Sequence, residues 1–217
     1  RLDRETSGVL LVAKQRAALV ALHAAWREGD VDKRYQVLVR GRWRDAMRKV
    51  SLSMHKFVTR EGERRVRIDD DGQDALTIFR RIEVWSKREP PLALLEAELR
   101  TGRTHQIRVH LTHLGFPLAG DDKYGDFAWN RELAKTGLKR MFLHAATLSL
   151  AHPLTGQALR ISSPLPADLA RFSRPYGLAL DGRRVMVADA GNHAIRQLDL
   201  ATMTVSTVAG GTAGYLD

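Results

Sequence analysis

The chain has 217 residues, of which 44% are hydrophobic, enough for one sizeable domain and a small second unit. Its 35 Lys and Arg residues against 25 Asp and Glu residues give a formal charge of +10, which suits a phosphate backbone or an anionic membrane. The sequence contains no cysteine, which excludes disulfides and thiolate zinc sites and fits a reducing compartment. No apolar run approaches the length of a membrane span, so the composition favours a nucleic acid as partner and no membrane.

The first eight residues place Asp3 between Arg1 and Arg4. The apolar run from Val9 to Ala13 follows at once and predicts a buried strand. A carboxylate held between guanidinium groups has a fixed geometry, so Asp3 is a candidate oriented anion or nucleophile. Taken alone, the octapeptide is also compatible with a surface ion pair.

Residues 15–28 carry Leu19, Leu22 and Trp26 at helical spacing, which predicts an amphipathic helix that ends at Gly29. We expect Trp26 to pack on the core. Residues 34–40 alternate as a strand does, with Tyr35 at the start of that strand.

Residues 40–67 are rich in Arg and Lys and poor in apolar side chains, which predicts short strands and loops before an acidic turn at residues 69–72. Their charge fits a solvated face or a track for an RNA backbone. We favour the RNA track because of the motifs that follow.

Residues 92–100 predict a strand that leads into an Arg-rich segment, residues 100–110, with three Arg and two His. From His105 the apolar spacing predicts a short helix that stops at Gly115. His105, His110 and His113 suggest a metal site, but only the last two share a helical face and no Cys accompanies them. We therefore expect no metal.

Together with residues 1–8, 33–41, 120–125 and 142–148, the Arg-rich segment resembles the motifs of the RluA-type family of RNA pseudouridine synthases, in the same order. The resemblance runs from Arg1 to about Leu169. It implies an α+β fold of the pseudouridine synthase type, with a mixed, largely antiparallel sheet and an active cleft across its middle. Because the sequence starts inside a motif, we expect its amino end to be truncated.

The resemblance implies an enzyme that detaches a uracil from its ribose in RNA, rotates it and rejoins it through C5, with no cofactor. The base must first be flipped out of the stack, and in the family the Arg at the position of Arg1 fills the gap. Asp3 matches the essential carboxylate, which acts as a nucleophile or takes the proton from C2′; both routes stay open.

By motif alignment, Arg108 is the expected salt-bridge partner of Asp3, with Arg103 as the fallback. Arg103 otherwise suits an RNA phosphate. Tyr35 matches the family's active-site Tyr, which stacks on the flipped uracil and helps to remove the C5 proton. The full set of predicted site residues is Asp3, Tyr35 and Arg108 for catalysis, and Arg1, Arg4, Arg103, His105 and Gln106 for substrate binding.

The composition changes after residues 164–169. Four short strand signals in the remaining chain resemble one NHL repeat, that is, one propeller blade. A single blade has no partner on which to bury its faces, so we expect a weakly held appendage that does not carry the activity. The predicted domains are a catalytic domain at residues 1–170 and an NHL-repeat-like β segment at residues 171–217.

The sequence therefore predicts a monomeric, cytoplasmic RNA pseudouridine synthase that acts on ribosomal RNA, with transfer RNA as the second choice. Two other classes remain open: a non-catalytic RNA-binding module, and an interaction protein built on the NHL-like segment.

Overall fold

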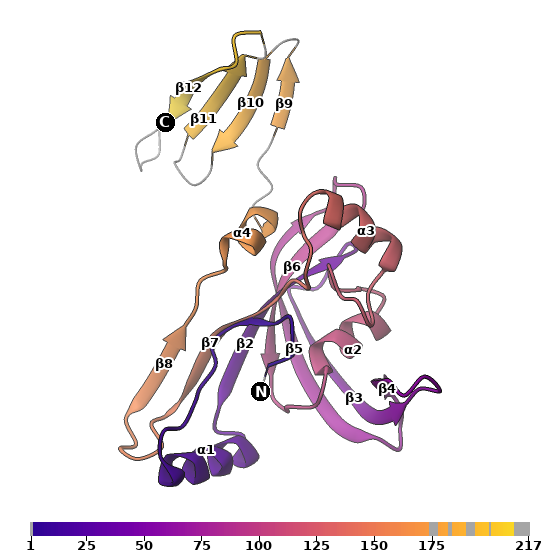
Figure 1. The fold of residues 1–217 in the computed structure, drawn as a ribbon, viewed down its shortest axis with the longest axis vertical. Helices are drawn as coiled ribbons and strands as arrows, with labels where there is room; N and C mark the ends of the chain where they lie inside the picture. Colours follow the sequence, from indigo (N-terminus) through magenta and orange to yellow (C-terminus); the bar gives the residue numbers. More distant parts are fainter. Residues whose placement is uncertain (1, 174–177, 182–183, 190–193, 200, 211–217) are drawn as a thin grey trace. The chain divides into compact units, whose positions relative to one another are not determined.

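The computed structural model of the protein describes residues 2–173, 178–181, 184–189, 194–199 and 201–210 (Figure 1). The chain divides into two compact units, Arg1–Leu169 and Ala170–Asp217.

The first unit is built on one eight-stranded sheet in the order β1-β7-β2-β6-β5-β3-β4, with β8 paired to β7. Its strands are β1 (Ser7–Gly8), β2 (Asp32–Arg40), β3 (Met47–Val58), β4 (Arg64–Ile68), β5 (Gln73–Trp85), β6 (Leu92–Leu99), β7 (Leu143–Ala151) and β8 (Ala158–Ser162). The pair β1 and β7 is parallel, and the other pairs of this sheet are antiparallel. The predicted mixed, largely antiparallel sheet is confirmed.

The described residues form four helices: α1 (Arg16–Glu28), α2 (Gln106–His113), α3 (Phe127–Lys135) and α4 (Ala167–Ser173). α1 and α2 lie where the apolar spacing predicted helices, and Gly29 ends α1 in the left-handed conformation. Ile107 and Leu111 of α2 enter the main core beside Val37 and Phe79, so this helix is fixed against the sheet. Among the described helices, none is long and apolar enough to cross a membrane.

The predicted strand over residues 9–13 is wrong. Only Ser7 and Gly8 pair with β7, and Leu10 and Val12 are exposed. The remaining apolar side chains of this run, Val9 and Leu11, pack in a small cluster with Leu22 of α1. The buried members of this cluster are Val31 and, from β7, Leu148 and Leu150, so the run is apolar on the side that packs against β7 and α1.

The region predicted to hold short strands contains one long strand, β3. It pairs with β5 along its first part and with β4 along its second. Val50 and Met54 are buried while most of its other side chains are exposed or half-buried. Two partner strands stabilise the extended backbone, so a strand of low apolar content reaches this length.

The second unit holds β9 (Leu178–Asp181), β10 (Arg184–Asp189), β11 (Ala194–Asp199) and β12 (Thr204–Gly210). They form a four-stranded antiparallel sheet in which neighbours in sequence are neighbours in space. The predicted Asp-Gly turn and Gly-Asn turn lie outside the described residues.

Candidate active site

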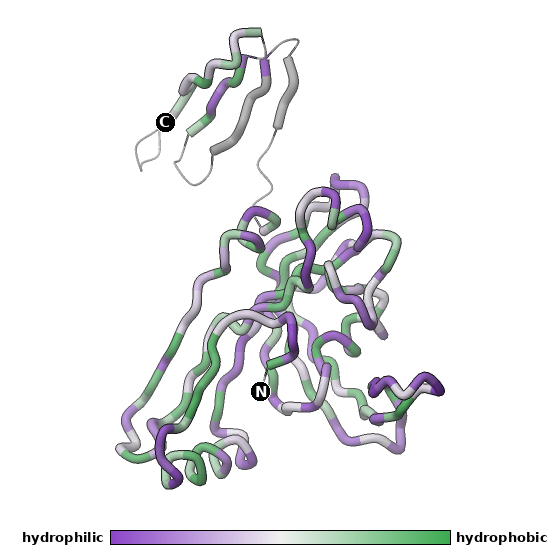
Figure 2. The backbone as a smooth tube through the Cα atoms, in the orientation of Figure 1, coloured by the Kyte–Doolittle hydropathy of each residue, from purple (hydrophilic) through white to green (hydrophobic). Residues whose placement is uncertain are grey.

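A cleft of about 1060 Å³ lies in the first unit. Its walls come from the amino-terminal loop, the start of β2, the β3–β4 hairpin, the loop before α2 and the loop after Asp121. Figure 2 shows that the hairpin is mostly hydrophilic, and Lys56, Arg64 and Arg65 line the cleft from it. The cleft is therefore walled by cationic side chains on the hairpin side.

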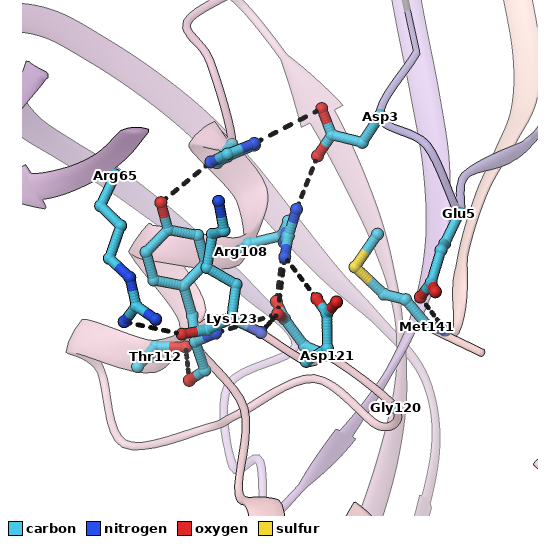
Figure 3. Close-up of polar contacts among 12 residues, drawn as sticks. Asp3, Glu5, Arg65, Arg108, Thr112, Gly120, Asp121, Lys123 and Met141 are labelled. Carbon is cyan, nitrogen blue, oxygen red and sulfur yellow. Dashed lines mark hydrogen bonds and ion pairs between the residues drawn. The ribbon is translucent and has the colours of Figure 1, made fainter. Parts of the chain in front are cut away.

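The loop that carries Asp3 is fastened to the sheet at several points. Gly8 has a φ of +110°, and a Cβ atom there would lie 2.1 Å from the Ala145 carbonyl oxygen, so only glycine permits this approach to β7. The Glu5 carboxylate accepts a hydrogen bond from the Met141 backbone N–H at 3.2 Å (Figure 3). Arg140 donates to the Glu5 carbonyl and to the Ser7 hydroxyl. These contacts hold Asp3 at the cleft.

The buried guanidinium of Arg108 joins two carboxylates in this cleft (Figure 3). Its Nη1 lies 3.1 Å from Asp3 Oδ2, while Nε and Nη2 each donate to Asp121 at 2.7 Å. Burial acts to lower the pKa of Arg108, but the hydrogen bonds and charges of Asp121 and Asp3 outweigh it and raise that pKa. Arg108 is thus a permanent cation that presents one edge to Asp3.

Asp121 had no predicted role, yet it fixes the orientation of Arg108. It is fully buried and also accepts hydrogen bonds from the backbone N–H groups of Lys123 and Tyr124. Burial acts to raise the pKa of Asp121, but the contacts with Arg108 and with the backbone N–H groups hold that pKa below its ordinary value. The sequence feature that could have pointed to this role is the position of Asp121, an acidic residue, within the motif at residues 120–125.

Tyr35 lines the cleft from the start of β2, next to a bulge between Arg34 and Tyr35 in the pairing with β7. Bulges of this kind re-aim side chains beside active sites. Burial, assisted by the negative charge of Asp3, raises the pKa of Tyr35 to about 12. Its hydroxyl therefore keeps its proton at neutral pH.

Lys33 is a second cleft residue without a predicted role. It is buried, and this burial lowers the pKa of its ammonium, with Asp32 acting in the opposite direction. A cation that is deep in a cleft and only partly compensated is a natural ligand for a phosphate.

The predicted substrate-binding residues differ in how they are placed. Arg1 lies outside the described residues. Arg4 and Arg103 are exposed and line the cleft, and Arg103 Nε donates to the Asp74 carbonyl, so it is Arg108 and not Arg103 that pairs with Asp3.

Gln106 lines the cleft but is held by hydrogen bonds within the protein, and its contact with the substrate stays a prediction. It is 2% exposed. Its carbonyl oxygen accepts from Thr101 Oγ1 and the Arg103 N–H, and its amide nitrogen donates to the Leu76 carbonyl and Thr77 Oγ1. Since both protons and both lone pairs are used, Gln106 anchors the loop before α2.

His105 faces the cleft from a left-handed backbone conformation with φ of 54°. Its Nδ1 lies 2.9 Å from the Tyr124 hydroxyl and its Nε2 lies 4.0 Å from Asp3 Oδ1.

His110, by contrast, is fully buried, and burial lowers its pKa to about 4. Within the described part of the chain, no group of three or more His, Asp and Glu residues is placed to hold a metal ion.

Comparison with known proteins agrees with this geometry. Residues 1–113 match the family model described as RNA pseudouridylate synthase. The chain is 46% identical over 173 residues to ribosomal large subunit pseudouridine synthase C of Escherichia coli (strain K12), covering 79% of this chain and 53% of that protein. The Pasteurella multocida protein of the same name is 45% identical over 172 residues, covering 79% of this chain and 52% of that protein. The chain thus spans about half the length of the curated relatives it matches.

Two solved structures are similar to the chain. Human RNA pseudouridylate synthase domain containing 1 superposes with a TM-score of 0.66 at 28% identity, covering 76% of this chain and 67% of that one. Human RNA pseudouridylate synthase domain containing 4 has a TM-score of 0.61 at 24% identity, covering 78% and 71%, and supports the fold alone.

Proposed function

Because the chain belongs to the RNA pseudouridylate synthase family, we propose that it isomerises uridine to pseudouridine in structured RNA. The observation that carries this proposal is the ion pair of Asp3 with the buried Arg108, which Asp121 orients inside a cleft with cationic walls. A carboxylate fixed in this way is suited to chemistry at a sugar or a base.

In the proposed reaction the C1′–N1 bond breaks, the uracil turns and a C1′–C5 bond forms. N1 gains a proton and C5 loses one. Asp3 acts as the nucleophile or takes the C2′ proton, and Arg108 holds its carboxylate in position in either case. Asp3 is the residue to which we assign the chemistry.

Tyr35 is assigned to stacking on the flipped uracil. Its predicted share in removing the C5 proton stays a prediction, since its hydroxyl is protonated at neutral pH with a pKa of about 12. Its ring supplies an apolar face beside Asp3.

Contact with the RNA backbone is assigned to exposed Arg4 and Arg103 and to the cationic residues of the β3–β4 hairpin, because phosphate contacts dominate RNA affinity. Arg1 keeps its predicted place in the vacated base stack. No cofactor is needed, because the reaction is an internal transfer.

Ribosomal large-subunit RNA is the proposed substrate, since that is what the names of the bacterial relatives state. Transfer RNA is the alternative. We propose a monomer that acts in the cytoplasm, and a second unit that is a single blade of the NHL-repeat type, for which the four-stranded antiparallel order of β9 to β12 is the support.

The test is to incubate the full chain with unmodified large-subunit ribosomal RNA and, separately, with transfer RNA transcripts. Each RNA is digested to nucleosides and its pseudouridine quantified by chromatography. We expect pseudouridine in the ribosomal RNA. RNA that is bound but unmodified in both samples would favour the non-catalytic RNA-binding module.

A further inference from the structure

His105 and Asp3 face each other across a gap that no protein atom bridges with a described hydrogen bond. Nε2 of His105 lies 4.0 Å from Asp3 Oδ1, while the other carboxylate oxygen is held by Arg108 at 3.1 Å. A separation of 4.0 Å is too long for a direct hydrogen bond. An oxygen atom about 2.8 Å from both atoms would fit between them, with an angle close to a right angle at that oxygen.

The protonation of the two partners requires a bridging oxygen that can both accept and donate a hydrogen bond. Tyr124 Oη already accepts a hydrogen bond from the Val66 N–H at 2.9 Å, so its own proton is free to be donated to His105 Nδ1, 2.9 Å away. In that arrangement His105 is neutral and carries its proton on Nε2, which points toward Asp3.

The electrostatics agree with a neutral ring. Burial lowers the pKa of His105; Asp3 and Asp121 act to raise it, and Arg108 and Lys123 to lower it. The gap is thus flanked by an N–H donor on one side and by Oδ1 of the Asp3 carboxyl group on the other. A hydroxyl group satisfies both, because it accepts one hydrogen bond and donates another.

The backbone of His105 supports a functional reading of this arrangement. A φ of 54° is uncommon for a residue other than glycine, and such conformations cluster at ligand sites. Tyr124 is itself fixed, since its backbone N–H donates to Asp121 and its carbonyl accepts from Thr112 Oγ1. The imidazole is therefore held in place by a rigid neighbour.

We propose that His105, oriented by Tyr124, forms with Asp3 a subsite for the 2′-hydroxyl of the target ribose and so selects RNA over DNA at that nucleotide. The 2′-hydroxyl is the group that distinguishes the two nucleic acids at a single site. This inference rests on the proposed function, because it places the target nucleotide in this cleft.

The first test uses the full chain without RNA. Nitrogen-15 NMR of the histidine side chains should show His105 as the neutral Nε2–H tautomer at pH 7, and Tyr124→Phe should weaken that preference. An Nδ1–H tautomer, or an imidazolium, in the wild-type chain would overturn the proposal.

The second test measures equilibrium binding by fluorescence anisotropy. The probe is a ribosomal large-subunit RNA fragment that contains the uridine modified in the nucleoside assay, made with ribose or with 2′-deoxyribose at that one nucleotide. We expect the wild-type chain to bind the deoxy probe about fivefold to tenfold more weakly, as the loss of one or two net hydrogen bonds predicts.

His105→Asn is the matched variant, because Asn tolerates the left-handed conformation but its amide is shorter than the imidazole. Because Asp3 can still accept a hydrogen bond from the hydroxyl, His105→Asn should distinguish the ribose probe from the deoxyribose probe less strongly than the wild-type chain does, and so should Tyr124→Phe. A third probe carries the 2′-deoxyribose at the neighbouring nucleotide instead. Its affinity relative to the all-ribose probe should be the same for the wild-type chain and both variants.

If His105→Asn fails to fold, Tyr124→Phe carries the comparison. The inference would be overturned if the folded variants distinguished the ribose and deoxyribose probes as strongly as the wild-type chain does. It would also be overturned if the wild-type chain bound the two probes with equal affinity. Failure of the proposed function would look different, because turnover itself would be absent, whereas failure of this inference leaves turnover and removes only the dependence on His105.

Discussion

Asp121 and Asp122 are adjacent carboxylates that approach the same guanidinium, yet they differ in burial. Asp121 is fully buried and contacts Arg108 twice at 2.7 Å, whereas Asp122 is mostly exposed and lies 3.5 Å away. Solvent screens the exposed pair but not the buried one. The two residues therefore form a matched pair for testing what orients Arg108.

We expect Asp121→Asn to lower the free energy of unfolding by about 3 kcal/mol, because it leaves buried Arg108 short of a counter-charge. With Arg108 misplaced, kcat should fall about tenfold to a hundredfold while RNA affinity changes little. Urea unfolding and initial rates measure the two effects. Asp122→Asn should be nearly silent in both, and equal losses in the two variants would contradict this account.

At the scale of single residues, the sequence motifs predicted that Arg108 and Asp3 would meet, and they do. Gln106 came from the same motif, but its amide is consumed by Thr77, Thr101 and backbone groups. A motif shows which residues accompany a site and does not show which of them face inward. That distinction depends on neighbours distant in sequence, as the contact of Asp121 with Arg108 also does.

At the scale of elements, α1 was predictable from its apolar spacing, but the environment of Trp26 was not. Trp26 was expected to pack on the core; instead it is 39% exposed and lines the edge of the cleft. Helical periodicity identifies the stripe of a helix that is apolar. It does not say which part of that stripe the rest of the fold leaves uncovered.

An exposed Trp beside cationic residues is a stacking surface for an unpaired base. We therefore expect Trp26→Ala to weaken RNA binding by about 1 to 3 kcal/mol with little change in stability. Binding is measured by titration with labelled ribosomal RNA fragments. Val20→Ala, on the same helix and more exposed but outside the cleft, should bind like the wild-type chain. If both variants bind normally, Trp26 is only a surface residue.

α2 carries a buried histidine with a consequence for acid stability. Burial lowers the pKa of His110 to about 4, with the Leu52 backbone acting in the opposite direction and His113 in the same one. Between pH 6.5 and 4 the unfolded chain binds a proton that the folded chain does not, so the free energy of unfolding rises with pH in this window and is flat above it.

From pH 7.5 to pH 5 this histidine should cost the wild-type chain about 2 kcal/mol of stability, measured by urea unfolding. In His110→Leu the free energy of unfolding should fall by about 2 kcal/mol less over the same pH range. The contributions of the other titrating groups should be the same in both chains. Parallel stability curves for the two chains over this pH range would show that His110 is not responsible.

At the scale of the whole molecule, the mixed sheet and the family were both predictable, because motifs for the cleft are spread over residues 1–148 in a fixed order. The length of β3 and the irregular run at residues 9–13 were not predictable. β3 is extended by pairing with the next two strands, and the run at residues 9–13 is placed by packing on β7 and α1, neither of which local alternation reports.

The two units should also be separable in function. Leu169 is fully buried in the first unit and α4 ends at Ser173, so a chain that stops after Ser173 keeps the core of that unit. We expect its kcat/KM for ribosomal RNA to stay within about twofold of the full chain, since a domain keeps its own core. Loss of turnover by this shortened chain while it remains folded would place part of the function in residues 174–217.

Asp3, held by Arg108, is the residue to which we assign the isomerisation. The most direct measurement is tritium release from RNA labelled at uridine C5, because that hydrogen leaves only when the base is rejoined through C5. The wild-type chain and the exposed control Asp70→Asn should release tritium at equal rates, and Asp3→Asn, folded and still binding RNA, should release none. Release by Asp3→Asn at the wild-type rate would contradict the account.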